Sequence, residues 1–216
     1  MNKKVFTIIC LAVLVLSFAS ARVVNFALGP SYGYFKGVAP LSDEDKDSNI
    51  PYEGNGFGLD WTVSFTFGSR AELFFQEVFN FSGKTAFEGL GDDFLIGTMD
   101  YKSYVGYEHA IITGPLKLSV GVAAAIEAVT SIYQYQVGDE LTTMLPMVLN
   151  FGVGATLKAE AELGKHLAFY AKANVDYMPF SVFVIAFDPS DDEPVSWGNT
   201  TNNFSYGVSA GLVLYF

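Results

Sequence analysis

Apolar residues alternate with small or polar ones along most of this chain, and this period of two constrains the fold more than any other feature. The last thirteen residues show it most regularly. One face of that segment carries Phe204, Tyr206, Val208, Ala210, Leu212, Leu214 and Phe216, while the positions between them hold mainly Ser and Gly. Because successive side chains of a strand point to opposite faces, this pattern predicts a strand with one apolar and one polar face.

Eight segments carry the same alternation. They are expected as strands at residues 22–36, 57–68, 70–81, 99–112, 115–129, 148–161, 166–179 and 204–216. Short turns at Phe67–Arg70, Thr113–Pro115 and Leu163–Lys165 alternate with long loops at 37–56, 82–98, 130–147 and 180–203. An even antiparallel meander with short turns at one end and long loops at the other is typical of bacterial transmembrane barrels. We therefore predict an all-β, eight-stranded antiparallel up-and-down transmembrane β-barrel.

The orientation of one strand is left open by its own pattern. Within residues 70–81 the alternation puts Glu77 in phase with the apolar side chains. A glutamate that faces lipid near the middle of a membrane is unfavourable. A β-bulge or a register shift would turn Glu77 inward, and the sequence is compatible with either arrangement.

A soluble lipocalin-like barrel is the serious alternative, since it also has eight strands and would face its apolar side inward. Side-chain size separates the two. The polar face is rich in Gly, Ala, Ser and Thr, which suit the narrow interior of an eight-stranded barrel. The apolar face carries large aromatic residues that are expected at the two membrane interfaces. They are Tyr32, Tyr34, Trp61, Tyr107, Tyr177, Tyr206 and Phe216. We therefore expect the apolar face to lie outside.

The N-terminal segment, residues 1–21, is predicted to be a secretory signal peptide. Two lysines precede a largely apolar run over residues 5–16, and Ala19 and Ala21 form an A-x-A cleavage site. Cleavage after Ala21 would leave residues 22–216 as the barrel.

Charged residues on the polar face predict a network inside the barrel. The expected members are Asp60, Glu72, Lys102, Glu108, Lys117, Glu127, Lys158, Glu160, Lys172 and Asp176. Charges in an interior need partners. One interpretation is a ladder of ion pairs that plugs the lumen, and the other is a gated polar pathway for protons or small ions.

The long loops are acidic. They hold fourteen acidic residues and two lysines, so their net charge is −12, and the whole chain carries −11. Such a balance excludes nucleic acid as a partner, because phosphates require a basic face. The run Asp43–Asp47 resembles the start of an EF-hand loop, but Ser48 stands where glycine is required and Gly54 where the final glutamate is required. We predict no dedicated metal site, while divalent cations bridging this rim to lipid phosphates are left open.

Catalysis is not predicted. His109 and His166 are the only histidines, and both fall near the short-turn end without a serine and an acid at a recognisable spacing. The single cysteine, Cys10, lies in the predicted signal segment. Without a phosphate-binding loop or a metal motif, no cofactor is expected.

In these features the chain resembles the small eight-stranded outer-membrane proteins of diderm bacteria, the architectural type of OmpX, OmpW and the membrane domain of OmpA. The resemblance rests on the signal segment, the loop asymmetry and the C-terminal strand. It implies residence in the outer membrane, contact with its lipids, and export and insertion by dedicated machinery. It also implies that the terminal strand is the insertion signal, with Tyr206, Val208, Leu212, Leu214 and Phe216 as its apolar face.

Two functions are compatible with this architecture. The first is a non-enzymatic barrel with a structural or adhesin-like role, in which the acidic loops bind an extracellular ligand. The alternative is a narrow channel for small or apolar solutes. For that channel the apolar segments Met144–Val148 and Phe180–Phe187 would line an opening near the rim.

Overall fold

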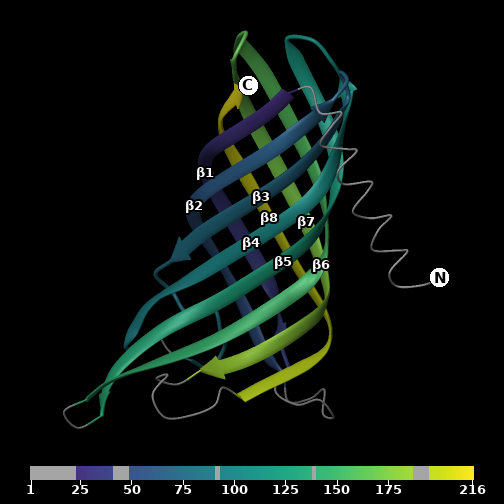
Figure 1. Ribbon diagram of the computed structural model, residues 1–216. Coiled ribbons are helices and arrows are strands. Elements are labelled where there is room, and N and C mark those ends of the chain that lie inside the picture. Colours follow the sequence, from purple (N-terminus) through teal and green to yellow (C-terminus); the bar gives the residue numbers. More distant parts are fainter. Residues whose placement is uncertain (1–22, 41–48, 91–92, 138–139, 187–194) are drawn as a thin grey trace, which may run out of the picture.

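The computed structural model describes residues 23–40, 49–90, 93–137, 140–186 and 195–216, which form one closed β-barrel (Figure 1). The strands are β1 (Val23–Ala39), β2 (Ile50–Phe67), β3 (Ala71–Ser82), β4 (Leu95–Ile112), β5 (Leu116–Val137), β6 (Glu140–Gly164), β7 (Leu167–Ala186) and β8 (Val195–Tyr215). Each strand pairs antiparallel with the next, and β8 pairs with β1. The structure confirms the predicted eight-stranded antiparallel up-and-down barrel. The predicted signal peptide lies outside the described residues.

No helix in the described part of the chain is long and apolar enough to cross a membrane.

The short turns gather at one end of the barrel, the upper end in Figure 1, as predicted. Gly68 and Gly114 lie in two of them with φ of +67° and +131°. Side chains with a Cβ rarely adopt these conformations, so glycine permits the chain to reverse within a few residues. We refer to this end as the turn end and to the opposite end as the loop end.

Strands at the loop end are longer than the sequence predicted. The predicted loops 130–147 and 180–203 are wrong over most of their length, because β5, β6, β7 and β8 extend into them. Pairing between β5 and β6 continues to Val137 and Glu140, and β2 begins already at Ile50. These segments contain many aromatic and β-branched residues, which fit a paired strand even above the regular part of a barrel.

A β-bulge lets β7 continue past a proline. The register between β7 and β8 shifts between Met178 and Phe180, with Pro179 at the irregular position. Proline cannot donate a ladder hydrogen bond and is tolerated at bulges. The shift also changes which side chains face outward, so that Tyr177 and Phe180 are both exposed while Met178 between them is buried.

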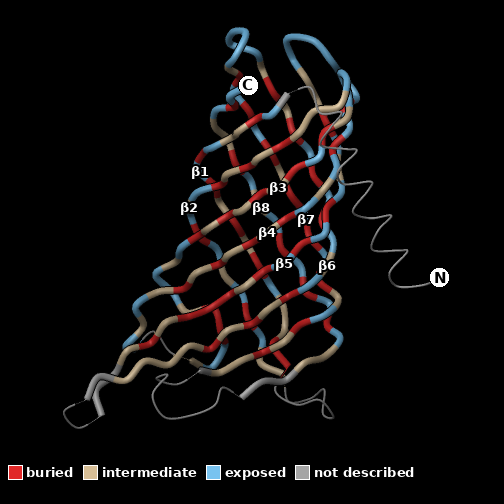
Figure 2. The backbone as a smooth tube through the Cα atoms, in the orientation of Figure 1, coloured by how far each residue is buried: buried red, intermediate tan, exposed pale blue. Residues whose placement is uncertain are grey.

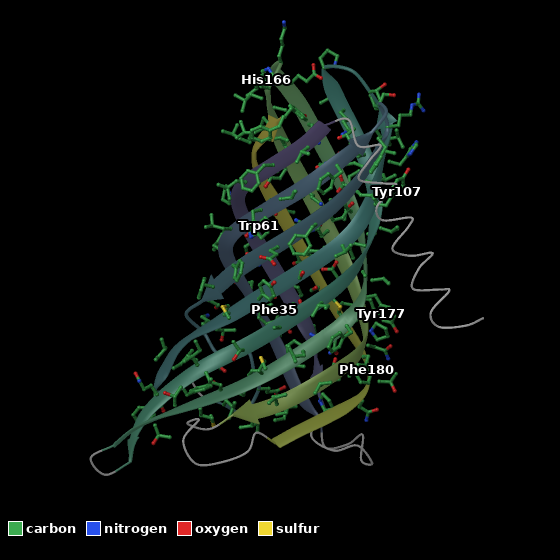
Figure 3. The ribbon with its side chains drawn as sticks, in the orientation of Figure 1. Phe35, Trp61, Tyr107, His166, Tyr177 and Phe180 are labelled. Carbon is green, nitrogen blue, oxygen red and sulfur yellow. The ribbon has the colours of Figure 1, made fainter. Side chains whose placement is uncertain are left out.

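Burial follows the predicted alternation, with buried and exposed residues taking turns along each strand (Figure 2). Side chains that face the lumen are mostly polar or charged, and the exposed large side chains are apolar. Tyr177 lies toward the loop end and Tyr107 toward the turn end, as expected for interface residues (Figure 3). Trp61 does not fit that expectation: it pairs with Leu28 in the middle of the outward apolar run of β2.

Strand β3 has a continuous register, which settles the orientation left open by the sequence. Its pairing with β2 and β4 runs without a shift from Ala71 to Phe81. Glu72 and Gln76 are buried in the lumen, so Glu77 lies in the outward set with Phe75 and Phe79. The outward arrangement of Glu77 is the one that the structure adopts.

The C-terminal strand closes the barrel with its apolar face outward. The side chains of Tyr206, Val208, Leu212, Leu214 and Phe216 are all exposed. The backbone N–H of Phe216 donates a hydrogen bond to the carbonyl oxygen of Val24 at 2.9 Å. The last residue of the chain thus joins the edge of β1.

Candidate functional site in the lumen

All ten charged residues that the sequence placed inside the barrel lie in the lumen. Nine of them are buried, with exposed fractions of 6% or less, and Lys117 is partly exposed at the turn end. Asp60 stands apart, and the other nine separate into two groups, the second of which also includes Asp100. The turn-side cluster comprises Glu72, Glu108, Lys117, Lys158, Glu160 and Lys172, and the loop-side cluster comprises Asp100, Lys102, Glu127 and Asp176.

The turn-side cluster matches three carboxylates with three lysines. Lys158 is its centre, since its Nζ lies 3.0 Å from Glu72, 2.7 Å from Glu108 and 3.1 Å from Glu160. Lys117 contacts Glu72 at 2.9 Å and Glu160 at 3.3 Å. Every carboxylate therefore contacts two ammonium groups, because Lys172 also contacts Glu108.

Lys172 connects this cluster to the apolar part of the lumen. Its Nζ lies 2.9 Å from Oε1 of Glu108 and 3.9 Å from the ring centroid of Phe74. A cation over an aromatic face is attracted by the ring quadrupole. The ammonium is thus held by a carboxylate and by a ring at the same time.

The loop-side cluster surrounds a single lysine with three carboxylates. The Nζ of Lys102 lies 3.2 Å from Glu127, 3.7 Å from Asp100 and 3.9 Å from Asp176. The formal charge of these four residues is −2. Because two of the three distances exceed an ordinary hydrogen bond, Lys102 alone does not satisfy the three acids.

Neutral donors supply the remaining hydrogen bonds of these carboxylates. Asp176 accepts hydrogen bonds from the Tyr104 hydroxyl at 2.8 Å and the Ser205 hydroxyl at 3.0 Å. Glu127 accepts one from the Asn150 amide at 2.7 Å, and the Asn80 amide donates to Asp100 at 3.2 Å. The separate carboxylate Asp60 is held in the same way, by Gln76 and Ser209.

A layer of amides and hydroxyls, not predicted from the sequence, lies at the loop end of the charged network. The Asn203 amide donates to Oδ1 of Asn150 at 3.0 Å and to the Ser181 hydroxyl at 2.8 Å. Asn150 also donates to the hydroxyl of Tyr52 at 2.7 Å. The alternation could have identified Asn150, which is inward in a predicted strand, whereas Tyr52, Ser181 and Asn203 fell in the predicted loops 37–56 and 180–203.

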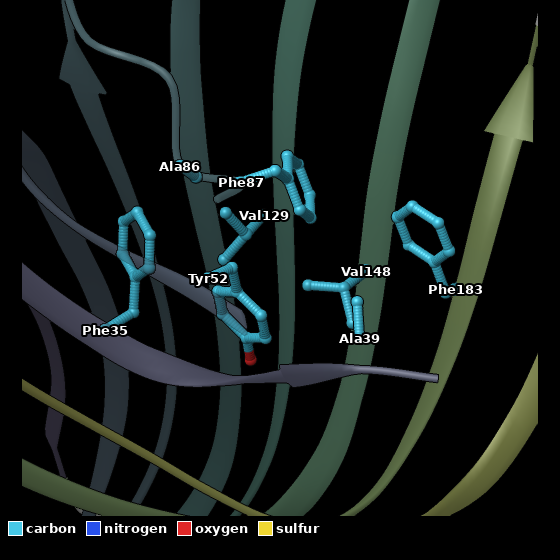
Figure 4. Close-up of a cluster of buried hydrophobic side chains, with 8 residues drawn as sticks. All are labelled: Phe35, Ala39, Tyr52, Ala86, Phe87, Val129, Val148 and Phe183. Atoms are coloured by element: carbon cyan, nitrogen blue, oxygen red, sulfur yellow. The ribbon is translucent and has the colours of Figure 1, made fainter. Parts of the chain in front are cut away.

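A cluster of buried apolar side chains, here called the apolar cap, lies beyond this layer (Figure 4). It consists of Phe35, Ala39, Tyr52, Ala86, Phe87, Val129, Val148 and Phe183. Ala86 and Phe87 come from the segment after β3, which turns inward and pairs with the start of β2. The Ala86 carbonyl accepts a hydrogen bond from the Glu53 N–H at 2.9 Å. Val148 and Phe183 belong to the two apolar segments that the channel hypothesis placed at an opening, and both lie inside the cap.

Around the buried charges, the described residues of the lumen leave little free space. Two cavities within it are each about 10 Å³, one lined in part by Asp60 and Lys102 and the other in part by Glu72 and Lys158. Each has room for about one water molecule. Of the two interpretations of the lumen charges, this geometry favours a plug over an open pathway.

The histidines lie outside the lumen. His109 is exposed, with its Nδ1 3.1 Å from the Tyr107 hydroxyl, and His166 lies at the turn end with its Nδ1 3.1 Å from the carbonyl oxygen of Tyr215 (Figure 3). Within the described residues no group of three His, Cys, Asp or Glu side chains could hold a metal ion. The acidic run Asp43–Asp47 lies outside the described residues.

One ion pair lies on the outer surface at the loop end. Lys36 contacts Glu53 at 2.9 Å just beyond Tyr34, whose hydroxyl donates to the same carboxylate at 2.7 Å. Both charged side chains are exposed. The hydrogen bond from Lys36, followed by that from Tyr34, lowers the pKa of Glu53 below its ordinary value of 4.5.

No family model matches this chain, and no curated protein matches it in sequence. Solved structures match its fold. The outer membrane protein OprG from Pseudomonas aeruginosa is 11% identical, with 91% of this chain and 97% of OprG covered and a TM-score of 0.55. A major outer membrane protein from Thermus thermophilus is 13% identical, with 88% and 99% covered and a TM-score of 0.53. The chain therefore has the fold of the small outer-membrane β-barrels, as the sequence resemblance implied.

The outer membrane protease OmpT from Escherichia coli also matches, but only at 10% identity and a TM-score of 0.42. That likeness carries no argument about catalysis. The absence of enzymatic activity stays a prediction from the sequence.

Proposed function

We propose that this chain is a non-enzymatic integral protein of a bacterial outer membrane that acts through its loop end and outer surface rather than through its lumen. The filled lumen carries the proposal. A charged network, an amide layer and an apolar cap follow one another along the barrel axis, and the two cavities described beside the charged residues have room for about one water molecule each.

The outward face supports residence in a membrane. A closed barrel leaves no unpaired sheet edge, which is the condition for spanning hydrocarbon with strands. On β1 the outward side chains from Val24 to Tyr34 are apolar or aromatic, and the next one is the charged Lys36. That run of eleven residues matches the roughly 9–11 residues of a tilted transmembrane strand.

Conductance in planar bilayers tests the filled lumen. The purified full-length barrel is expected to give no stable conductance steps, whereas a general porin inserted by the same procedure serves as the positive control. Stable, reproducible steps from the wild-type barrel would contradict the proposal and favour the channel alternative. The apolar cap is the observation that keeps an apolar-solute channel as the second candidate, since such solutes would have to enter through Phe35, Phe87 and Phe183.

We propose that the acidic loop end contacts a basic partner outside the cell. The net charge of −12 over the four predicted long loops supports this, because a strongly single-signed surface attracts partners of the opposite charge and does so less at high salt. On intact cells, added protease should cut between the end of β1 and the start of β2, or between the end of β7 and the start of β8. Cleavage that occurs only after rupture of the outer membrane would contradict this orientation.

We also propose that the C-terminal strand is recognised by the insertion machinery. Phe216 is exposed at the end of the outward face of β8, where it is free to be contacted before the barrel closes. A Phe216→Asp variant should accumulate outside the membrane fraction, whereas Ile111→Asp, at the same end on β4, should insert more efficiently. Equal membrane recovery of both variants would exclude a specific role for the terminal residue.

A further inference from the structure

Glu77 is the single carboxylate or ammonium group in the outward apolar face of the described strands between their ends. It lies at the middle of the outward run of β3, which extends from Leu73 to Phe81. Across the sheet its neighbours are Trp61 on β2 and Ser103 on β4. The carboxyl group of Glu77, which is costly in hydrocarbon, therefore lies near the middle of the lipid-facing surface of the barrel.

Aromatic rings frame this carboxyl group. The rings of Trp61 and Phe75 meet edge to face, with 5.5 Å between their centroids. The rings of Phe79 and Tyr101 are tilted to each other, with 4.7 Å between their centroids. The Tyr101 hydroxyl donates a hydrogen bond to Oε1 of Glu77 at 3.0 Å. The result is a small polar centre in a broad, rigid aromatic surface.

The hydrogen-bonding capacity of the centre is only partly used. Among the described residues, Tyr101 is the one partner that Glu77 has, and it occupies one of the two carboxyl oxygens. Lipid chains offer no donor or acceptor for the other oxygen. A carboxyl group in hydrocarbon is neutral or paired, and in its neutral form it needs an acceptor for its own O–H.

We propose that this face, formed by Trp61, Phe75, Glu77, Phe79, Tyr101 and Ser103, binds a second copy of the chain. Two copies inserted in the same direction are related by a twofold axis along the membrane normal, and a twofold interface requires a patch that is complementary to itself. A neutral carboxyl group and a serine hydroxyl are each both donor and acceptor. With Glu77 near the axis, each copy supplies the acceptor that the other lacks.

The aromatic frame suits such a contact. Aromatic residues are enriched at the centres of protein interfaces, where they supply a large contact area at a small loss of conformational entropy. The rings lie on both sides of Glu77, so in a contact between two copies they would surround the hydrogen bonds of the two carboxyl groups and separate them from lipid. The same arrangement on a single copy leaves the rings against lipid and the carboxyl half satisfied.

The barrel leaves this face open above the membrane. β3 is the shortest strand, with 12 residues, and the segment that follows it turns inward to bury Ala86 and Phe87 in the apolar cap. The long β5–β6 hairpin extends away from the barrel in Figure 1, and it belongs to other strands. At the loop end the last outward side chain of β3 is the apolar and exposed Phe81, which a second barrel could contact.

Sedimentation equilibrium of the purified full-length barrel in detergent micelles tests the proposal. Wild type should self-associate to a dimer as the protein-to-detergent ratio rises. Glu77→Leu should weaken the dimer at least tenfold, whereas Glu77→Gln, which keeps a donor and an acceptor, should weaken it no more than about threefold. Val153→Leu, at a mid-membrane outward position on β6, is the matched control and should leave association unchanged.

Loss of dimer in Glu77→Leu cannot be attributed to unfolding, because that change removes a polar group from the apolar face. Its heat-modifiable gel mobility should equal that of wild type. A wild-type protein that stays monomeric at every ratio, or a Glu77→Leu variant that associates like wild type, would overturn the proposal. So would saturable binding of tetraphenylphosphonium by monomeric wild type that Glu77→Gln abolishes, since the centre would then be a site for lipophilic cations.

Cross-linking in native membranes provides the second measurement. In a background with Cys10→Ser, Ser103→Cys should form a disulfide-linked dimer on mild oxidation, and Val153→Cys should not. Equal cross-linking at both positions, or none at residue 103, would refute the assigned face.

Discussion

The turn-side cluster of the lumen satisfies its carboxylates with ammonium groups, whereas the loop-side cluster satisfies them largely with neutral donors. Glu72, Glu108 and Glu160 each contact two lysines. Asp100, Glu127 and Asp176 share Lys102 and otherwise rely on hydroxyls and amides.

This difference shows that one barrel can fill its interior by two electrostatic strategies. Redundant ion pairs tolerate the loss of one lysine, because each carboxylate keeps another. A shared lysine does not, since its removal leaves several buried carboxylates without any cation. The same inward alternation produces both clusters, so the distinction lies in which residues the strand register brings together.

Removing Lys102 should have the largest effect on stability. We expect Lys102→Met to lower the free energy of unfolding by about 3–5 kcal/mol, the range for leaving buried charges unpaired. Urea unfolding in phospholipid bilayers, followed by the gel mobility of the folded form, measures it. Lys158→Met is the matched variant in the turn-side cluster, where Lys117 and Lys172 still contact the same carboxylates, and it should cost less. If Lys158→Met were the more destabilising of the two, the redundancy argument would fail.

Neutralising one carboxylate in each cluster should give opposite results. Glu108→Gln removes a partner of both Lys158 and Lys172 and is expected to destabilise the barrel by about 1–3 kcal/mol. Asp100→Asn removes excess negative charge beside Glu127 and Asp176, so it should be neutral or stabilising. The same unfolding measurement decides. Similar losses of unfolding free energy in both variants would show that the excess negative charge of the loop-side cluster does not destabilise the barrel.

The Lys36–Glu53 pair outside the membrane should contribute least, since exposed ion pairs are weak and screened by salt. Because Lys36 and Tyr34 lower the pKa of Glu53, its contribution is present above pH 4.5 and is lost as the pH falls through the lowered value. Glu53→Gln should therefore differ slightly from wild type at pH 7 and converge with it in strong acid. A difference in unfolding free energy that grows as the pH falls would contradict the lowered pKa of Glu53. Lys36→Met, which removes the other partner of the pair, is the control.

Much of the fold could be predicted from local pattern. Inward and outward faces follow from the alternation itself, because the backbone geometry of a strand sends successive side chains to opposite sides. For that reason Lys102 and Glu127 could be assigned to the lumen without knowing which strands pair. Strand ends were predicted less well: nothing local distinguished the loop 130–147 from an extension of β5 and β6.

What only the tertiary structure decided depends on register and closure. Lys102 lies directly across from Glu127 because β4 and β5 pair in one register, and Asp176 approaches the same lysine across the lumen from β7. No pattern in the sequence encodes those distances, since the first depends on the register of β4 with β5 and the second on closure of the barrel. Glu77 shows both contributions. The alternation placed it in phase with the outward apolar side chains, and the unbroken pairing of β3 with both neighbours determined that no bulge turns it inward. Side-chain period is a local property of the backbone, whereas the partner of a buried charge is set by strands far apart in the chain.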